Sequence, residues 1–200
     1  LTLPAQVEQV YYFRLQAAGP LLVPGRLWEA KAFHSYERSD YLGQAWYFGM
    51  VSAMVLFNLL LFVALRDVIY LLYVNFVTCA ALAIAAQNGL AKEFFWTEAT
   101  QWSDTSIPIG FSLSLAALLI FMRRMLNTKT VIPRVDRLLV LLVGLFLLSP
   151  LAFVISLPSF AKSAVVLNLG SLLLILGVSL FCAYKRQRSA YFFVAAFAML

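Results

Sequence analysis

The sequence predicts an all-α transmembrane helical bundle, preceded by the terminal strands of an extracytoplasmic β domain. Hydrophobic residues make up 63% of the chain and charged residues 12%, whereas a soluble domain carries about 25% charged residues. The stretch Trp46–Leu65 contains no charged residue. As a helix it would reach across roughly 30 Å, the thickness of a bilayer's hydrocarbon core. Four complete apolar runs and one partial run follow it.

Residues 1–40 are expected to lie in water and to contain two strands and a connector. Apolar and polar residues alternate over Tyr12–Ala17, which is typical of a half-buried strand. Leu21–Trp28 is expected to form a second strand, and Ala30–Gly43 a polar connector. Because two strands alone are marginal in water, we expect them to complete a sheet whose other strands precede Leu1. The chain ends inside an apolar run, so we expect it to be a fragment of a longer protein.

Residues 41–200 are expected to form the membrane bundle, with helices at about 46–65, 69–90, 107–126, 138–155 and 164–184 and an incomplete sixth at 190–200. Pro108 is expected in the first turn of the third helix, where a missing N–H has little effect. Pro150 should kink the fourth helix or end it early. Arg123 and Arg124, at the end of the third helix, are expected to reach into the headgroups.

Lys and Arg gather in alternate connections between these helices. The first, third and fifth connections hold nine of them, and the second and fourth hold two. Short cytoplasmic loops accumulate Lys and Arg, so the odd-numbered connections are expected in the cytoplasm and residues 1–45 outside. The net charge of +6 is therefore attributed to topology and to contact with membrane lipids, and no nucleic-acid partner is expected. In this topology all four tryptophans lie outside or at the outer interface: Trp28, Trp46, Trp96 and Trp102.

The polar residues inside the apolar runs are amides and hydroxyls. No Asp, Glu, Lys, Arg or His lies well inside a run, which argues against a pump or a proton-coupled transporter. Asn58, Asn75 and Asn168 are candidates for helix–helix hydrogen bonds, or for a polar switch that differs between two packings of the helices. Ser112, Ser114 and Ser171 accompany them.

Two short motifs lie at the expected outer mouth of the bundle. Gln87 and Asn88 precede Gly89, a pattern that predicts a helix C-cap. The alternative is a contact from Gln87 and Asn88 to the outer domain or to a ligand. The aromatic run that follows is expected to re-enter the membrane interface or to dock the outer domain onto the bundle; it consists of Phe94, Phe95 and Trp96.

No catalytic constellation, metal-ligand cluster or phosphate-binding loop is visible, so the sequence predicts no catalytic residue, no metal site and no cofactor. Cys79 and Cys182 each lie in a long apolar run and are expected to be small buried hydrophobic residues. His34, the only histidine, has no cysteine or clustered carboxylate beside it.

The segment Tyr47–Phe76 resembles the first two helices of the bacterial seven-transmembrane receptors with diverse intracellular signalling modules. Residues 11–33 are similar to the last strands of the periplasmic β-sandwich sensor domain that precedes the membrane domain in that family. Asn88-Gly89, followed by the aromatic run, and Arg124 and Leu126 with the later Pro133 also match. The family features in the first two helices are Tyr47 with Gly49, Asn58-Leu59, Arg66-Asp67, and Tyr70 with Tyr73.

This resemblance implies a multi-pass protein of the bacterial inner (plasma) membrane with a periplasmic N-terminal region. The fold would be of the seven-helix receptor type, truncated here, with a sixth and a seventh helix after Ala190. It also implies a cytoplasmic output domain in the same chain, such as a diguanylate cyclase, a histidine kinase or a phosphatase, and an unknown periplasmic ligand, by analogy a carbohydrate. A homodimer is compatible with this architecture, although no residue indicates it.

Two functions follow from these observations. The first is a signal-transducing receptor that couples ligand sensing by the periplasmic domain to the cytoplasmic output module. The alternative is a transporter or channel for a neutral small solute, in which Asn58, Asn75, Asn168 and the serines would line a path; the inverted repeats and broken helices common in transporters are not visible. A membrane-embedded enzyme has no positive feature in its favour.

Overall fold

The computed structural model describes residues 28–94, 100–185 and 188–198, and every element in these ranges is helical. The predicted membrane bundle is confirmed, because five of the helices are long and apolar enough to cross a membrane: α1, α2, α4, α6 and α7. The predicted strand Tyr12–Ala17 and nearly all of Leu21–Trp28 lie outside the described residues. The helices are α1 (Ala30–Leu65), α2 (Val68–Gln87), α3 (Leu90–Phe94), α4 (Thr100–Met125), α5 (Thr128–Val131), α6 (Pro133–Ile155), α7 (Leu157–Tyr184) and α8 (Arg188–Ala198).

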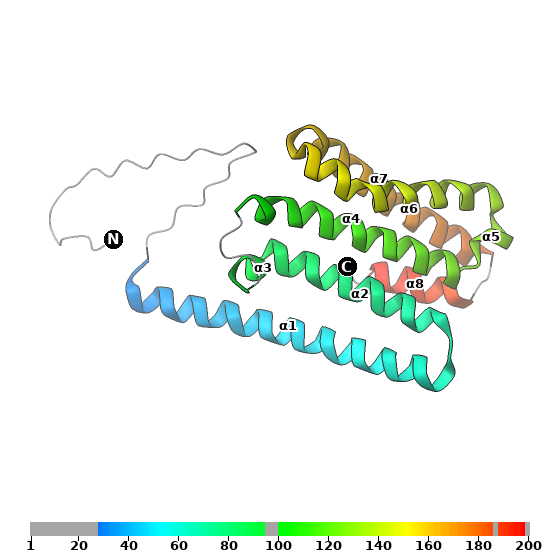
Figure 1. Cartoon of the computed structure of the whole chain (residues 1–200). Helices are drawn as coiled ribbons and strands as arrows, with labels where there is room; N and C mark the ends of the chain where they lie inside the picture. Colours follow the sequence, from blue (N-terminus) through cyan, green and yellow to red (C-terminus); the bar gives the residue numbers. More distant parts are fainter. Residues whose placement is uncertain (1–27, 95–99, 186–187, 199–200) are drawn as a thin grey trace.

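The long helices lie side by side, with α4 in a central position (Figure 1). Helix α2 packs between α1 and α4, and α4 also contacts α6 and α7. Helix α8 packs against α7. The α3 end of the bundle holds the beginning of α1 and the short helix α3, and the α5 end holds α5 and the α1–α2 turn (Figure 1). The buried core lies among α4, α6, α7 and α8 and includes Leu119, Met122, Leu139, Phe146, Ile175 and Cys182.

Helix α1 begins at Ala30, well before the predicted start at Trp46, so the expected connector Ala30–Gly43 is helical. Local hydrogen bonds explain why the polar residues continue the helix. The amide of Phe33 donates to the Glu29 carbonyl at 2.9 Å, and Gln44 Nε2 donates to Asp40 Oδ2, one turn away, at 2.8 Å.

The two prolines inside helices differ from what was predicted. Helix α4 begins at Thr100, so Pro108 lies within the helix and not in its first turn. Helix α6 continues through Pro150 to Ile155 and is not ended early. Because proline has no N–H, the carbonyl four residues before it loses its helical partner. Here that carbonyl belongs to Phe146, and Ser149 Oγ donates to it at 2.8 Å.

Close packing of α2 against α4 depends on two small residues. Ala83 is fully buried, and a Cβ atom added to Gly110 would lie 2.9 Å from both Cα and Cβ of Ala83. Small residues allow membrane helices to approach closely, and dispersion contacts then hold them together. Glycine at 110 therefore sets the distance between α2 and α4.

The turn between α1 and α2, at Arg66 and Asp67, is stabilised from both sides. Arg66 has a left-handed backbone (φ 52°), and its amide donates to the Phe62 carbonyl at 2.7 Å. Asp67 accepts a hydrogen bond from the Ile69 amide at 3.0 Å and so caps α2.

Candidate functional site

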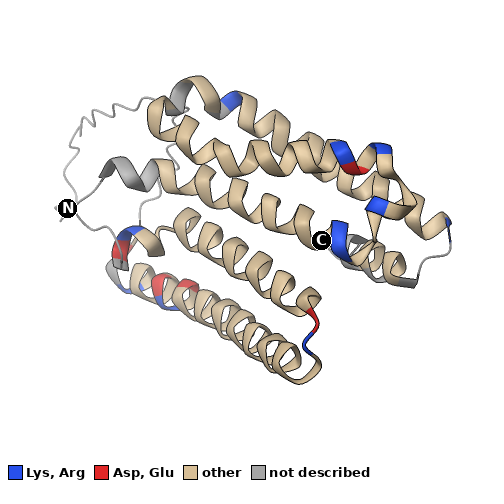
Figure 2. Ribbon diagram, turned by 45° about the vertical axis from the view of Figure 1, so that its right-hand side comes forward, with Lys and Arg blue, Asp and Glu red and all other residues tan. Residues whose placement is uncertain are grey.

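Charged side chains in the described part of the chain gather at the two ends of the bundle, and the middle is free of them (Figure 2). This agrees with the prediction that no ionisable residue lies well inside a span. The candidate functional groups are therefore sought at the α3 end and the α5 end, and among the amides between them.

A cleft opens at the α3 end between the first half of α1 and the turn that joins α2 to α3. It consists of two adjoining hollows of about 440 Å³ and about 210 Å³. Tyr36, Asp40, Gln44 and Asn88 line both of them. We call this feature the α1–α3 cleft. The larger hollow is also lined by Ser39, Gly43, Tyr47 and Ile84, and the smaller by Phe33, Glu37, Tyr41, Leu90 and Glu93.

A hydrogen bond ties the two walls of the cleft together. Tyr41 Oη on α1 donates to the carboxylate of Glu93 on α3, at 3.0 Å and 3.2 Å from its two oxygens. Within α1, the amide group of Gln44 donates to Asp40. The carbonyl oxygen of Gln44 is buried and has no hydrogen-bond partner among the described residues.

The sequence prediction at this end was partly correct. Helix α2 ends at Gln87, and Gly89 has φ +82°, which confirms the predicted C-cap. The Asn88 amide donates to the Ile84 carbonyl at 2.9 Å, and Asn88 also lines the cleft. Gln87 is exposed and is not among the lining residues.

The α1 side of the cleft was missed because residues 30–43 were interpreted as a connector. The signal that could have found it is the spacing of Tyr36, Asp40, Gln44 and Tyr47, which places all four on one face of a helix. Phe94 ends α3, whereas Phe95 and Trp96 lie outside the described residues. Their expected contact with an outer domain stays a prediction.

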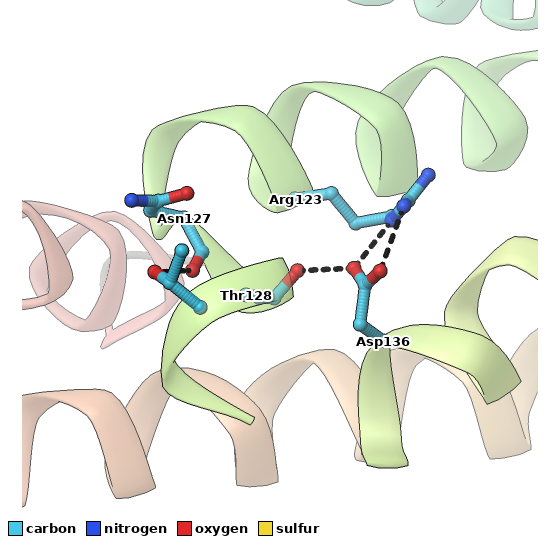
Figure 3. A network of polar contacts seen from close by, with 5 residues as sticks. Arg123, Asn127, Thr128 and Asp136 are labelled. Atoms are coloured by element: carbon cyan, nitrogen blue, oxygen red, sulfur yellow. Dashed lines mark hydrogen bonds and ion pairs between the residues drawn. The ribbon is translucent and has the colours of Figure 1, made fainter. Parts of the chain in front are cut away.

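At the α5 end, an ion pair joins α4 to α6 (Figure 3). Arg123 donates through Nε to Asp136 Oδ1 at 2.8 Å and through Nη2 to Oδ2 at 2.9 Å. Thr128 Oγ1, on α5, donates to the same Oδ1 at 2.6 Å. Asp136 is only 7% exposed. Two parallel bonds to a carboxylate fix both position and orientation, so these three residues, the α5-end clamp, hold three helices in one arrangement.

The clamp corrects the expectation that Arg123 reaches into the headgroups. Helix α6 begins at Pro133, earlier than predicted, and this places Asp136 in its first turn. Arg123 occupies the last turn of the preceding long helix. The two residues therefore meet once α4 and α6 turn back on each other. Arg124 is exposed, and its expected position in the headgroups stays a prediction.

The three membrane asparagines do not form a common site. Asn58 Nδ2 donates to the Met54 carbonyl of its own helix at 2.8 Å, and Asn75 is exposed on α2. Asn168, on α7, has a buried carbonyl oxygen without a partner in the described ranges. No hydrogen bond between any two of them is found in the part of the chain that the structure describes.

The membrane serines likewise bond within their helices. Ser114 donates to the Phe111 carbonyl at 3.0 Å, and Ser171 donates to the Leu167 carbonyl at 2.7 Å. Ser112 is buried on α4. The expected hydrogen bonds between helices are therefore not made by Ser114, Ser171 or Asn58, and the described residues offer no support for a polar path through the bundle.

Comparison with known proteins assigns the bundle to a family. The sequence profile described as 7TM diverse intracellular signalling matches residues 40–200, from the first half of α1 to the last residue. No curated protein and no solved structure matches the chain.

Proposed function

The chain belongs to the 7TM diverse intracellular signalling family, and from this membership we propose that it passes a signal from a periplasmic sensor domain to a cytoplasmic output module. The family makes the bundle a multi-pass membrane part of a signalling receptor. The sensor would precede α1, and the output module would follow the last helix. Ligand binding to the sensor can shift the bundle only as far as the ligand distinguishes two packings of the helices.

The observation that carries this proposal is the continuity of α1. It is one helix from Ala30 to Leu65, which corresponds to about 54 Å. It runs from the α3 end to the turn at the α5 end (Figure 1), and its main contact is with α2. A displacement of its first residues would therefore reach the far end without crossing a loop.

A chain of aromatic rings offers a path from α2 to the last described helix. The rings of Tyr73 on α2 and Phe121 on α4 have centroids 5.7 Å apart. The rings of Phe121 and Phe193, on α8, are 5.9 Å apart. Arg123 of the α5-end clamp lies two residues after Phe121. A displacement of α2 would therefore be passed through these ring contacts to α8, close to Arg123 of the α5-end clamp.

The distribution of basic residues supports the orientation that the proposal needs. The connections at the α5 end carry most of the Lys and Arg between the helices, and cytoplasmic loops accumulate these residues. The α5 end would then face the cytoplasm and the α3 end the periplasm.

Cysteine labelling tests this orientation with a matched pair. Lys92 and Lys129 are both exposed, at the α3 end and the α5 end respectively. In spheroplasts, a membrane-impermeant maleimide is expected to label Lys92→Cys, and to label Lys129→Cys only after the membrane is permeabilised. The unmodified chain, with Cys79 and Cys182 in the spans, gives the background. The opposite pattern of labelling would overturn the proposal.

The gene on either side of this segment provides a second test. We expect a β domain encoded before Leu1 and a folded output domain encoded after the last transmembrane helix. If neither is found in the reading frame, the receptor has neither a sensor nor an output, and the proposal fails even where the labelling pattern is as expected.

A further inference from the structure

One face of the membrane span α2 is exposed along its length, and it carries polar residues at mid-span. Asn75 and Thr78 are both exposed on this face, and Thr78 lies at the midpoint of the helix. The exposed residues recur at intervals of three and four, so they share one side of the helix. We call this side the α2 stripe. It consists of Val68, Leu71, Asn75, Thr78 and Leu82.

The two polar side chains of the α2 stripe have no hydrogen-bond partner in the part of the chain that the structure describes. Asn58 and Ser171 differ from them, because each donates to a carbonyl of its own helix. Lipid tails offer no hydrogen-bond partner, so an amide exposed to them is unfavourable. Asparagine and threonine within spans form hydrogen bonds to neighbouring helices. The α2 stripe is therefore suited to contact with another helix.

The last described helix, α8, lies on the opposite side of α2. The Tyr73 ring on α2 contacts Phe121 on α4, and Phe121 contacts Phe193 on α8. Successive residues of a helix are rotated by about 100°, so Asn75 points about 160° away from Tyr73. Consecutive elements usually lie side by side, so the seventh helix of the family, which would follow α8, is expected on the Tyr73 side. It would then leave the α2 stripe uncovered.

We propose that the protein forms a homodimer in which the α2 stripes of two copies pack against each other. All copies cross the membrane in the same direction, so the two-fold axis is parallel to the membrane normal and each stripe residue faces its own counterpart. An asparagine amide contains both donors and an acceptor. The Asn75 side chains of the two copies can therefore bond to each other.

The spacing of the α2 stripe supports this arrangement. Val68, Asn75 and Leu82 are seven residues apart, and so are Leu71 and Thr78. This is the repeat of two helices that wind around each other, in which one asparagine at the contact fixes the register and the number of helices. The apolar residues of the stripe would pack above and below the polar pair.

The exposed sides of α6 and α7 do not need a protein partner in the same way. The hollow between these helices has a mainly apolar lining, which includes Leu148 and Leu167. Its serines, Ser149 and Ser163, donate to carbonyls of their own helices at 2.8 Å. Lipid chains can cover such a surface without leaving a hydrogen bond unmade. Among these exposed surfaces, the α2 stripe is the one whose polar groups lack partners.

Disulfide cross-linking of the full-length protein in its membrane tests the contact. Leu71→Cys is introduced together with Cys79→Ala and Cys182→Ala, and copper phenanthroline is the oxidant. Cα atoms within about 7 Å of each other allow a disulfide, and identical residues at the two-fold axis meet this condition. Leu71→Cys is therefore expected to form a covalent dimer.

The matched control is Leu138→Cys on α6, in the same cysteine-free background. Leu138 is 47% exposed and Leu71 40%, and both lie near the start of helices that begin at the α5 end. Leu138→Cys is expected to remain monomeric on the gel. Equal cross-linking of both variants would indicate random collision and would overturn the proposal. So would the absence of a dimer from Leu71→Cys, the result expected if lipid or the seventh helix covers the α2 stripe.

A second measurement tests the role of Asn75. Energy transfer between fluorophores attached to Lys129→Cys, in the same background, reports association as the protein is diluted in lipid vesicles. Asn75→Leu should weaken association by about five- to tenfold, the effect of losing two hydrogen bonds between membrane helices. Asn75→Gln, which keeps an amide, should restore most of it. The melting temperature of each variant shows whether it is folded.

The control for Asn75→Leu is Asn58→Leu, because the Asn58 amide already bonds to its own helix. It is expected to leave association unchanged. Equal weakening by Asn58→Leu and Asn75→Leu would overturn the proposed pairing of Asn75. The inference goes beyond the proposed signalling function and does not depend on orientation, so a failed maleimide-labelling test would affect the receptor orientation alone and failed cross-linking the dimer alone.

Discussion

Helices α1 and α4 are both long and apolar, yet α4 lies at the centre of the bundle and α1 at its periphery. In the most apolar stretch of α4, 44% of residues are buried, whereas in that of α1 none is. The peripheral helix is nevertheless the more hydropathic of the two. In a membrane, an apolar side chain gains little free energy by moving from lipid into the protein. The helices at the centre of a bundle are therefore distinguished by small and polar residues that allow close contact. Hydropathy alone therefore identifies a span but not its place.

This difference assigns separate mechanical roles to the two helices. Helix α4 contacts α2, α6 and α7 and carries Gly110 and Arg123, which fix it to two of these neighbours. Helix α1 is attached mainly through α2 and through the Tyr41–Glu93 bond. A bundle that transmits a displacement needs one element that stays in place and one that can move against it. In the proposed receptor, α4 would therefore be the scaffold and α1 the transmitter.

The largest expected effect comes from breaking the clamp on α4. Asp136→Asn leaves the Arg123 guanidinium without its counter-charge. We expect a loss of about 3 kcal/mol in the free energy of unfolding, at the low end for such a change, because the Arg123 side chain is 27% exposed. Unfolding by sodium dodecyl sulfate in mixed micelles measures it.

The matching change on α1 is Glu37→Gln, which removes the ion pair with His34. The side chain of His34 is 77% exposed and that of Glu37 is 44% exposed, so the same measurement should detect a change of less than about 0.5 kcal/mol. Equal effects of Asp136→Asn and Glu37→Gln would contradict the distinction between scaffold and transmitter.

The second effect concerns apolar packing. Leu119 on α4 is fully buried and Leu60 on α1 is 68% exposed. Leu119→Ala leaves a cavity, and we expect a loss of about 2 kcal/mol. This is the low end of the range, because the unfolded chain stays in lipid and the transfer from water contributes little. Leu60→Ala, which faces the outside of the bundle, should change stability little in the same titration. If Leu60→Ala lowered the stability as much as Leu119→Ala, another element would have to pack against this face of α1.

Sequence reasoning located the spans because each is a long uncharged run whose backbone must form its own hydrogen bonds in lipid. The end of α2 was also predictable, since Asn88-Gly89 carries its conformation in the residue types. The start of α1 was not, because Trp46 marks only the first apolar residue of the run. The helix itself continues through polar residues that bond one turn apart, as Asp40 and Gln44 do.

The contacts between distant residues could not be predicted from the chain alone. Arg123 looked like one of several basic residues at a helix end, and its pairing with Asp136 depends on the turn that α5 makes between two helices. Gly110 is one of several glycines in apolar runs, and only its position opposite Ala83 distinguishes it. Such pairings arise from packing, which no local pattern records.

The third prediction compares two glycines and expects opposite signs. In Gly110→Ala the new Cβ would lie 2.9 Å from Ala83 Cα, so α2 and α4 must separate at a cost of about 1–2 kcal/mol. In Gly49→Ala, on α1, nothing lies within 4 Å of the new Cβ. Alanine is favoured over glycine in a helix by up to about 1 kcal/mol, so Gly49→Ala should stabilise the protein. The melting temperature of each variant in detergent shows the sign, and a gain for Gly110→Ala would contradict the close approach.

The smallest effect is expected at the outer tie of α1. Tyr41→Phe removes the hydrogen bond to Glu93, which is exposed to water and therefore contributes little to global stability. Its role is local, because α1 before Gly43 has few other attachments to α3. We expect an unchanged melting temperature and faster amide hydrogen exchange over residues 30–44 alone, since local opening of a segment depends on its own contacts. Tyr36→Phe, which leaves the hydrogen bond to Glu93 in place, serves as the control. If exchange over 30–44 is the same in Tyr41→Phe and Tyr36→Phe, the tie does not hold α1, and its attachment must come from α2 throughout its length.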